Sequence, residues 1–270
     1  MSCRTMLRVV VVVMSAAVAG GFIAPEPVAA TPFGVQIRSQ QYNLCDAACN
    51  RSDPPANLVI WMAVQEAPHT VSLNELCRAS LEEIQAATGL GISFYQSRTT
   101  ENCPLASNGQ RGYGNGTIVS GTMQDDDGGP FFAQQSGTPE VRGWVCRRGS
   151  TFVGWVVSCS AHMYSGSISI AQSQASEYAY WVSMAAHSNH PMRVLAGDFN
   201  LTPTERPSAF WGSSSVYSRP IITLTYPAEG PNKTFDYIHV RDPQLTATEL
   251  IGKNCAWSYS DHCYLWSEYH

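Results

Sequence analysis

The sequence carries few charged residues and no excess of positive charge. Only 14% of its 270 residues are charged, and the formal net charge is −5. We therefore expect no broad basic surface for a polyanion, so that a phosphate-bearing substrate would need local cations, helix ends or a metal ion. No internal repeat or low-complexity linker divides the chain. Since 44% of the residues are hydrophobic, the composition favours one domain with a large core.

The longest apolar run lies near the N-terminus and is too short and interrupted for a comfortable membrane span. Arg4 and Arg8 precede apolar residues 9–18, and Val28-Ala29-Ala30 offers small side chains for cleavage. This pattern is typical of a secretory signal peptide, with an uncleaved membrane anchor as the alternative. We predict a signal peptide at 1–30, cleaved after Ala30, and a secreted mature domain at 31–270 with a formal charge of −6.

The chain lacks any Cys-x-x-Cys pair, which argues against a zinc site. Without Cys3, which leaves with the signal peptide, eight cysteines remain, and an even number in an exported chain favours disulfides. Spacing alone does not fix their connectivity. Pairing between sequence neighbours would join Cys45 with Cys49, Cys77 with Cys103, Cys146 with Cys159, and Cys255 with Cys263.

The stretch Val194–Asn200 ends an apolar run with Gly197 and then two short polar residues, Asp198 and Asn200. Residues at i and i+2 of an extended chain point to the same face, so this stretch predicts a buried strand that presents a carboxylate and an amide together. Ends of strands in sheets with helical crossovers are places where ligands bind. The alternative is that both residues turn the chain by bonding their own backbone.

Several other predicted strands also end in polar residues. Residues 35–44 alternate and end at Asn43, and the apolar run 56–64 is followed by Glu66. Two strands over 143–160, joined by a turn at 147–150, run into His162. Residues 233–240 alternate around Asp236, and the last segment holds Asp261 and His262.

Two helices are predicted between these strands. Ser72 to Glu75 has the spacing of a capping box, and Leu73, Leu76, Leu81 and Ile84 form an apolar stripe that ends at Gly89. A second helix is predicted over 171–188.

The stretch from Tyr95 to Asn115 is polar and contains glycine, which predicts a loop. Arg111, Tyr113 and Asn115 are candidate substrate contacts there, and an ordinary solvated loop is the alternative. Asp125–Gly129 lacks the alternating ligands and distal Glu of a calcium loop, so we interpret it as a hairpin turn.

Taken together, the polar strand ends resemble those of the endonuclease/exonuclease/phosphatase (deoxyribonuclease I-like) superfamily. Within it, the chain resembles a secreted bacterial type. The resemblance spans residues 35–266, and its most specific parts are Gln65-Glu66, Gly197-Asp198-Phe199-Asn200, Phe235-Asp236-Tyr237-Ile238 and Ser260-Asp261-His262. The sequence departs from the usual family pattern around His162 and after His262. These departures weaken the assignment to a subfamily more than the assignment of catalytic residues. The resemblance implies an α/β (α+β) fold, a sandwich of two mixed β-sheets flanked by helices.

The resemblance also implies a metal-dependent phosphodiesterase. Glu66, Asn43 and Asp261 would bind Mg²⁺, with Mn²⁺ or Ca²⁺ as alternatives, since oxygen ligands suit these ions. His262 would be the general base, oriented by Asp236. Asp198 would orient the attacking water, and Asn200 and His162 would donate to the phosphate oxygens. Which histidine is acid and which is base follows the resemblance alone.

The leading hypothesis is a secreted nuclease that acts as a monomer on nucleic acid, without a protein partner. A sphingomyelinase-type phospholipase is the alternative within the enzymes, because Phe131-Phe132 would suit a membrane-dipping loop unless the two rings pack in the core. A binding module that keeps the fold without catalysis is the alternative from another class. The presence of both histidines and of the acids Glu66, Asp198, Asp236 and Asp261 argues against it.

Overall fold

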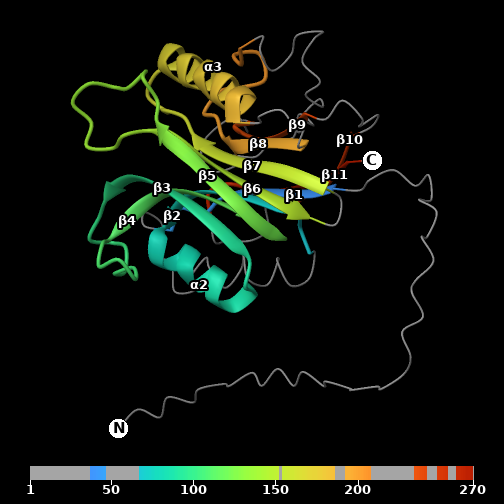
Figure 1. Cartoon of the computed structure of the whole chain (residues 1–270). Coiled ribbons are helices and arrows are strands. Elements are labelled where there is room, and N and C mark those ends of the chain that lie inside the picture. Colours follow the sequence, from blue (N-terminus) through green and yellow to red (C-terminus); the bar gives the residue numbers. More distant parts are fainter. Residues whose placement is uncertain are drawn as a thin grey trace, which may run out of the picture. The chain divides into compact units, whose positions relative to one another are not determined.

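The computed structural model describes residues 37–46, 67–151, 154–185, 192–207, 234–241, 248–254 and 260–269. Residues Gly34–His270 form one compact unit. Within the described parts of this unit, two mixed β-sheets stack face to face, and a helix packs on the outer face of each (Figure 1). This arrangement confirms the predicted α/β sandwich. Among the described residues, no helix has the length and apolarity needed to cross a membrane.

The first sheet has six strands in the order β10-β11-β1-β2-β4-β3. Strands β1 and β2 are parallel, and the other neighbours are antiparallel. The bounds are β1 Ile37–Asn43, β2 Thr70–Cys77, β3 Gly91–Thr99, β4 Gly112–Val119, β10 Thr248–Asn254 and β11 Tyr264–Tyr269. Because β1 and β2 are parallel, their carboxyl ends, with Asn43 paired to Asn74, meet at one edge of the sheet.

The second sheet has five strands in the order β5-β6-β7-β8-β9. Only β7 and β8 are parallel among these strands. The bounds are β5 Thr122–Pro130, β6 Gly143–Thr151, β7 Gly154–His162, β8 Met192–Asp198 and β9 Asp236–Arg241. The predicted buried strand before Asn200 is therefore confirmed as β8. All of its residues are buried except Arg193, which is half-buried.

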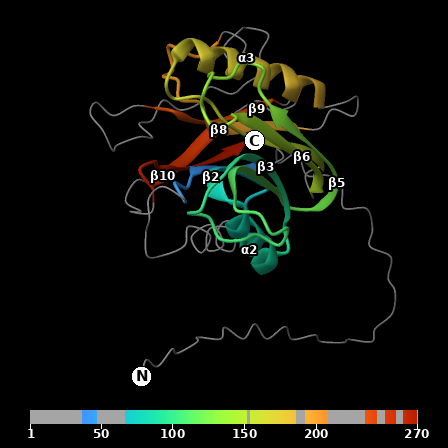
Figure 2. The ribbon, with the colours of Figure 1, turned by 90° about the vertical axis from the view of Figure 1, so that its left-hand side faces the viewer.

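The two helices cover opposite faces of the sandwich (Figure 2). Helix α2, Arg78–Thr88, buries Leu81 and Ile84 against the six-stranded sheet and ends at Gly89 in a left-handed conformation, as predicted. Helix α3, Ile168–Ala185, buries Tyr178 and Val182 against the five-stranded sheet. Between the sheets, apolar residues of β1 and β11 pack against those of β7, β8 and β9, which fixes the sheets face to face.

The prediction of a helix start at Ser72–Glu75 is wrong, because these residues lie in β2, where Ser72 and Leu73 pair with both β1 and β4. Pairing on both sides satisfies the backbone groups that a capping box would serve. Helix α2 instead begins after Cys77, whose N–H donates to the Asp46 carboxylate at 2.9 Å. A carboxylate at this end of a helix is stabilised by the exposed N–H groups.

Three predicted turns and loops are strands in the structure. Asp125–Gly129 lies inside β5 and pairs with β6, so it is no hairpin turn. Residues 147–150 continue β6 rather than turning, and the predicted loop over 95–115 includes the end of β3 and the start of β4. Glycine and short polar residues favour turns locally, but here cross-strand pairing decides.

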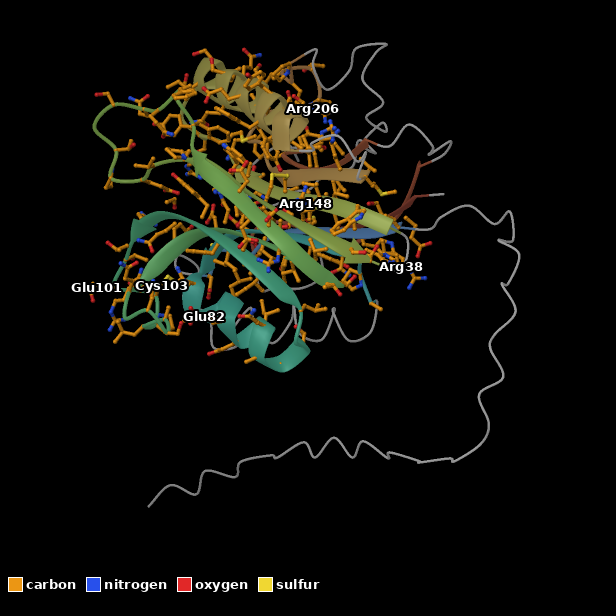
Figure 3. All side chains as sticks on the ribbon, viewed as in Figure 1. Arg38, Glu82, Glu101, Cys103, Arg148 and Arg206 are labelled. Atoms are coloured by element: carbon orange, nitrogen blue, oxygen red, sulfur yellow. A yellow bond between two sulfur atoms is a disulfide. The ribbon has the colours of Figure 1, made fainter. Side chains whose placement is uncertain are left out.

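Two of the predicted disulfides are confirmed, Cys77–Cys103 and Cys146–Cys159. Cys45 and Cys263 are also disulfide-bonded, but their predicted partners lie outside the described residues. The first bridge ties the end of β2 to the loop between β3 and β4, on which Glu101 and Cys103 lie (Figure 3).

Candidate active site

One row of residues crosses three neighbouring strands of the five-stranded sheet at the end of β8. His162 at the end of β7 is paired with Asp198 at the end of β8, and Asp198 is paired with Asp236 at the start of β9. Directly paired residues place their side chains on the same face of a sheet. A histidine and two carboxylates therefore gather on that face, and all three are at most 4% exposed.

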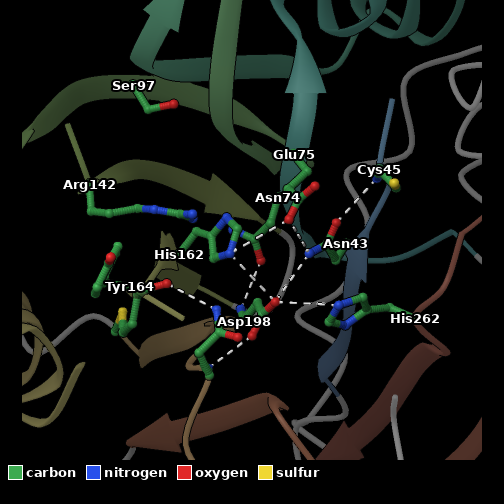
Figure 4. Close-up of polar contacts among 12 residues, drawn as sticks. Asn43, Cys45, Asn74, Glu75, Ser97, Arg142, His162, Tyr164, Asp198 and His262 are labelled. Carbon is green, nitrogen blue, oxygen red and sulfur yellow. Dashed lines mark hydrogen bonds and ion pairs between the residues drawn. The ribbon is translucent and has the colours of Figure 1, made fainter. Parts of the chain in front are cut away.

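The two oxygens of the Asp198 carboxylate have different surroundings (Figure 4). Oδ1 accepts the backbone N–H of Asn200 at 2.9 Å, which fixes the rotamer. Oδ2 accepts a hydrogen bond from Asn43 Nδ2 at 3.1 Å. The same oxygen lies 3.5 Å from His262 Nε2 and 3.6 Å from His162 Nε2. Burial raises the pKa of Asp198 to about 7, although the positive charge of His262 acts to lower it.

His262 is held by the second carboxylate of the row. Its Nδ1 lies 2.7 Å from Asp236 Oδ2, and both side chains are buried. Burial lowers the pKa of His262, but the negative charges of Asp236 and Asp198 outweigh it and raise this pKa to about 10. Because Nδ1 is engaged by Asp236, Nε2 is the nitrogen that faces Asp198 and the space at the strand ends.

Glu75 enters the same cluster from the six-stranded sheet through an irregularity of β2. The pairing of β2 with β4 shifts between Leu73 and Leu76, and Glu75 has a φ of 54°, which is uncommon for a residue with a side chain. This bulge interrupts the alternation of faces. Glu75 Oε1 accepts from Asn43 at 3.1 Å, and Oε2 accepts from the Tyr113 hydroxyl at 2.8 Å.

His162 is a neutral imidazole with a cation beside it. Burial first, and then the charges of Arg142 and His262, hold the pKa of His162 well below its usual value. The Arg142 guanidinium points toward the His162 ring (Figure 4). Its Nη1 is buried without a hydrogen-bond partner in the part of the chain that the structure describes. A buried N–H beside the cluster that lacks a protein acceptor is suited to bind an anionic group.

The cluster offers two groups of ligand atoms close enough to hold a metal ion. Glu75, His162 and Asp198 form one, and Asp198, Asp236 and His262 form the other, with ligand atoms within 4.8 Å of one another in each group. Asn43 lies against both Glu75 and Asp198, so that a rotated amide would add a further oxygen. Carboxylate and amide oxygens fit a hard divalent cation such as Mg²⁺.

Five of the residues proposed from sequence come together in this cluster: Asn43, His162, Asp198, Asp236 and His262. Asp261 is half-buried next to His262, and its charge also raises the pKa of His262. Glu66 lies outside the described residues, so its proposed metal binding stays a prediction.

Three other predicted site residues take unexpected places. Asn200 is left-handed, with a φ of 49°, and its Nδ2 donates to the Met163 carbonyl at 3.0 Å, so it does not extend beside Asp198 as expected. Arg111 Nη1 donates to the Cys103 carbonyl at 2.6 Å within its own loop. Asn115 is buried in β4, where its Nδ2 donates to the Gly143 carbonyl. Substrate binding by Arg111 and Asn115 stays a prediction.

Sequence reasoning missed three members of the site: Asn74, Glu75 and Arg142. Tyr113 was a predicted substrate contact, but its hydroxyl bonds Glu75. An available signal for Asn74 and Glu75 was the alternation of polar and apolar residues over 70–73, followed by two polar residues, as before Asn43. The capping-box spacing concealed it. Arg142 carried no comparable signal, because its place beside His162 arises from a contact between segments separated in sequence.

A sequence profile described as the Endonuclease/Exonuclease/phosphatase family matches residues 39–262. The chain belongs to this family. Enzymes of the endonuclease/exonuclease/phosphatase family are divalent-metal-dependent hydrolases of phosphodiesters or phosphate esters. The match includes every member of the cluster described above. A search of curated proteins found no match.

Solved structures share this fold at low sequence identity. The human Nocturnin catalytic domain with bound sulfate matches with a TM-score of 0.65 and 14% identity, over 87% of this chain and 94% of that one. An endonuclease/exonuclease/phosphatase from Bacteroides vulgatus matches with a TM-score of 0.62 and 12% identity, over 87% and 98%. D. rerio TDP2 complexed with single-strand DNA product matches with a TM-score of 0.58 and 16% identity, over 87% and 99%.

Proposed function

We propose that the protein is a secreted, metal-dependent phosphodiesterase and that its substrate is a nucleic acid. The observation that carries the proposal is the placement of His262, with one nitrogen bound to Asp236 at 2.7 Å and the other facing Asp198 at 3.5 Å. A histidine oriented in this way by a buried carboxylate is suited to move a proton at its other ring nitrogen. The resemblance of the fold to a DNA-bound TDP2 supports nucleic acid as the substrate class.

In this proposal the proton leaves the attacking water for His262 Nε2. Asp236 keeps Nδ1 protonated and stabilises the imidazolium that forms. Asp198, whose Oδ2 faces both histidines, orients the water. Neutral His162 and the buried Nη1 of Arg142 donate to the phosphate oxygens as negative charge develops on them.

We assign the metal-binding carboxylate to Glu75, with Asn43 beside it. Tyr113 holds one oxygen of Glu75, and the other oxygen faces Asn43 and lies 3.7 Å from His162. A bound divalent cation would neutralise charge on the phosphate and oppose protonation of His262. Asp261 and Glu66 are the further candidate ligands that the sequence suggested.

The phospholipase alternative has less support in the structure. Phe131 packs in the core at 2% exposure, so only Phe132, at 82%, is left of the proposed membrane-dipping pair. One ring contributes little apolar area for insertion into a bilayer. The mature chain is also acidic, which adds no attraction to an anionic lipid surface.

The test is hydrolysis of double-stranded DNA, single-stranded DNA, RNA and sphingomyelin vesicles by the purified protein, with Mg²⁺ and with excess chelator. We expect cleavage of at least one nucleic acid with Mg²⁺ and none with chelator. Cleavage of sphingomyelin alone would overturn the choice of substrate. Hydrolysis of none of the four, by a protein that is folded and Mg²⁺-loaded, would favour the binding module.

A further inference from the structure

Asn74 lies between the two sheets, next to Glu75, and has no exposed surface. Its Oδ1 accepts the Gln41 side-chain N–H and the Asp198 backbone N–H, both at 2.8 Å. Its Nδ2 faces the Ala161 carbonyl at 3.0 Å and the Ser160 hydroxyl at 3.2 Å, with Asn115 Oδ1 also at 3.2 Å. One amide of the six-stranded sheet thus binds the last residues of both β7 and β8.

These contacts require an amide rather than another polar group. Two N–H donors meet at Oδ1 and three oxygens surround Nδ2, so the amide has one satisfactory orientation. An aspartate here would place a carboxylate oxygen against the Ala161 carbonyl and lose both donors. A glutamine would need space for one more methylene in a fully buried position.

Gln41 connects this amide to the other carboxylate of the site. Its Nε2 donates to Asn74 Oδ1 at 2.8 Å and approaches Asp236 Oδ1 at 3.4 Å, while Asp236 Oδ2 holds His262. The Gln41 Oε1 is buried without a hydrogen-bond partner among the residues that the structure describes. A buried polar atom left in this way lowers stability, so stability alone does not account for Gln41.

We propose that Asn74 and Gln41 are positioning residues that hold Asp198 and Asp236 on the two nitrogens of His262. Asn74 fixes the backbone of Asp198, and Gln41 orients Asp236 from the same amide. Both side chains have no exposed surface, so they would act through the residues that they bond. This inference rests on the proposed function, since it concerns the histidine to which we assign the proton transfer.

The experiment compares three variants of the full protein: Gln41→Met, Asn74→Gln and the control Thr117→Val. Thr117 Oγ1 and Ser158 Oγ lie 2.7 Å apart and also join the two sheets, but away from His262. Methionine keeps the length of Gln41 without its polar atoms, so Gln41→Met is expected to remain folded even if Asn74→Gln does not. The probe is bis(p-nitrophenyl) phosphate with Mg²⁺, and kcat, KM and thermal unfolding are measured for each.

We expect Gln41→Met to lower kcat by about 10- to 100-fold, with KM within about twofold of wild type and no loss of thermal stability. Thr117→Val should lower stability and leave kcat within about twofold. Folded Asn74→Gln should follow Gln41→Met. The inference is overturned if Gln41→Met keeps the kcat of wild type, or if its kcat falls only as far as its folded fraction falls.

A second readout needs no substrate. The proton between His262 Nδ1 and Asp236 gives a downfield NMR signal, which should shift in Gln41→Met and stay unchanged in Thr117→Val. An unshifted signal in Gln41→Met would contradict the positioning role. If wild type hydrolyses no phosphodiester, the proposed function fails, and this signal alone then decides the inference.

Discussion

Asp198 and Asp236 lie directly opposite each other on antiparallel strands β8 and β9, and both carboxylates face the ring of His262. Asp236 bonds Nδ1 at 2.7 Å, whereas Asp198 faces Nε2 at 3.5 Å. Asp236 therefore sets the tautomer of His262. Asp198 lies on the Nε2 side, where the attacking water would be activated. The register of two strands thus fixes the orientation of the proposed base.

This arrangement makes the stability of the metal-free protein depend on pH. The folded-state pKa of His262 is raised to about 10, above its usual 6.5, so the folded state binds a proton that the unfolded state releases between these values. The contribution of His262 is complete below pH 6.5 and is lost as pH rises toward 10. The free energy of unfolding, wild type minus His262→Asn, should fall over this range by up to about 1.4 kcal/mol per pH unit. A difference that stays constant from pH 6.5 to 10 in denaturant titrations would contradict the charged pair.

Tyr113 tests the assignment of Glu75 as the metal-binding carboxylate. Its hydroxyl donates to Glu75 Oε2 at 2.8 Å, and Tyr113→Phe removes only that contact. The Mg²⁺ concentration for half-maximal hydrolysis should rise about 10-fold or more, because a freed carboxylate holds the ion less well. Tyr95→Phe is the matched control, since its hydroxyl donates to the exposed Val141 carbonyl and, among the described residues, to no side chain of the site. Equal Mg²⁺ requirements in the two variants would remove Glu75 from the metal site.

Gly197 is required by the close approach of β7 and β8. It has a φ of 150°, and an added Cβ would lie 2.0 Å from the Ala161 carbonyl oxygen. Gly197→Ala should lower the free energy of unfolding by about 3 kcal/mol, since neither strand can move without disturbing His162 and Asp198. Gly129→Ala, where an added Cβ meets no atom within 4 Å, is the control for chemical denaturation. A Gly197→Ala variant as stable as this control would show that the strands separate easily.

The Cys77–Cys103 bridge is expected to stabilise the fold by constraining the unfolded chain. It joins residues 26 apart, for which loop closure gives about 3 to 4 kcal/mol. Replacing both cysteines by alanine should lower the free energy of unfolding by about this amount. Both sulfurs are buried, so reductant should act slowly on the folded protein. Unchanged stability in the double variant would mean that the loop is held by its other contacts.

Strong local patterns in the sequence marked most strand ends of the site, and the family resemblance carried by those residues implied the sandwich. The apolar run before Asp198 and the alternating residues before Asn43 and around Asp236 each indicated a strand with polar residues at its end. These patterns depend on burial, which the sequence reports directly. Spacing alone did not fix the disulfides, but pairing between sequence neighbours holds for two of them, each of which links strands or a loop close along the chain.

Contacts between distant segments were beyond the reach of local patterns. Ser72–Glu75 has a good helix-start spacing, yet pairing with β1 and β4 makes it a strand, and its bulge brings Glu75 to the site. The left-handed backbone of Asn200 likewise depends on the Met163 carbonyl. Asn74 gained its proposed role through contacts with Asp198, Ala161 and Ser160, all more than eighty residues away.

The most direct test of the account is the hydrolysis of bis(p-nitrophenyl) phosphate with Mg²⁺ by wild type and by His262→Ala, both shown to be folded. Removing a general base should lower kcat by about 10²- to 10⁴-fold. Chelator should abolish the wild-type activity, and added Mg²⁺ should restore it. If His262→Ala hydrolyses the phosphodiester at the wild-type rate, His262 is not the base and the proposed mechanism is wrong.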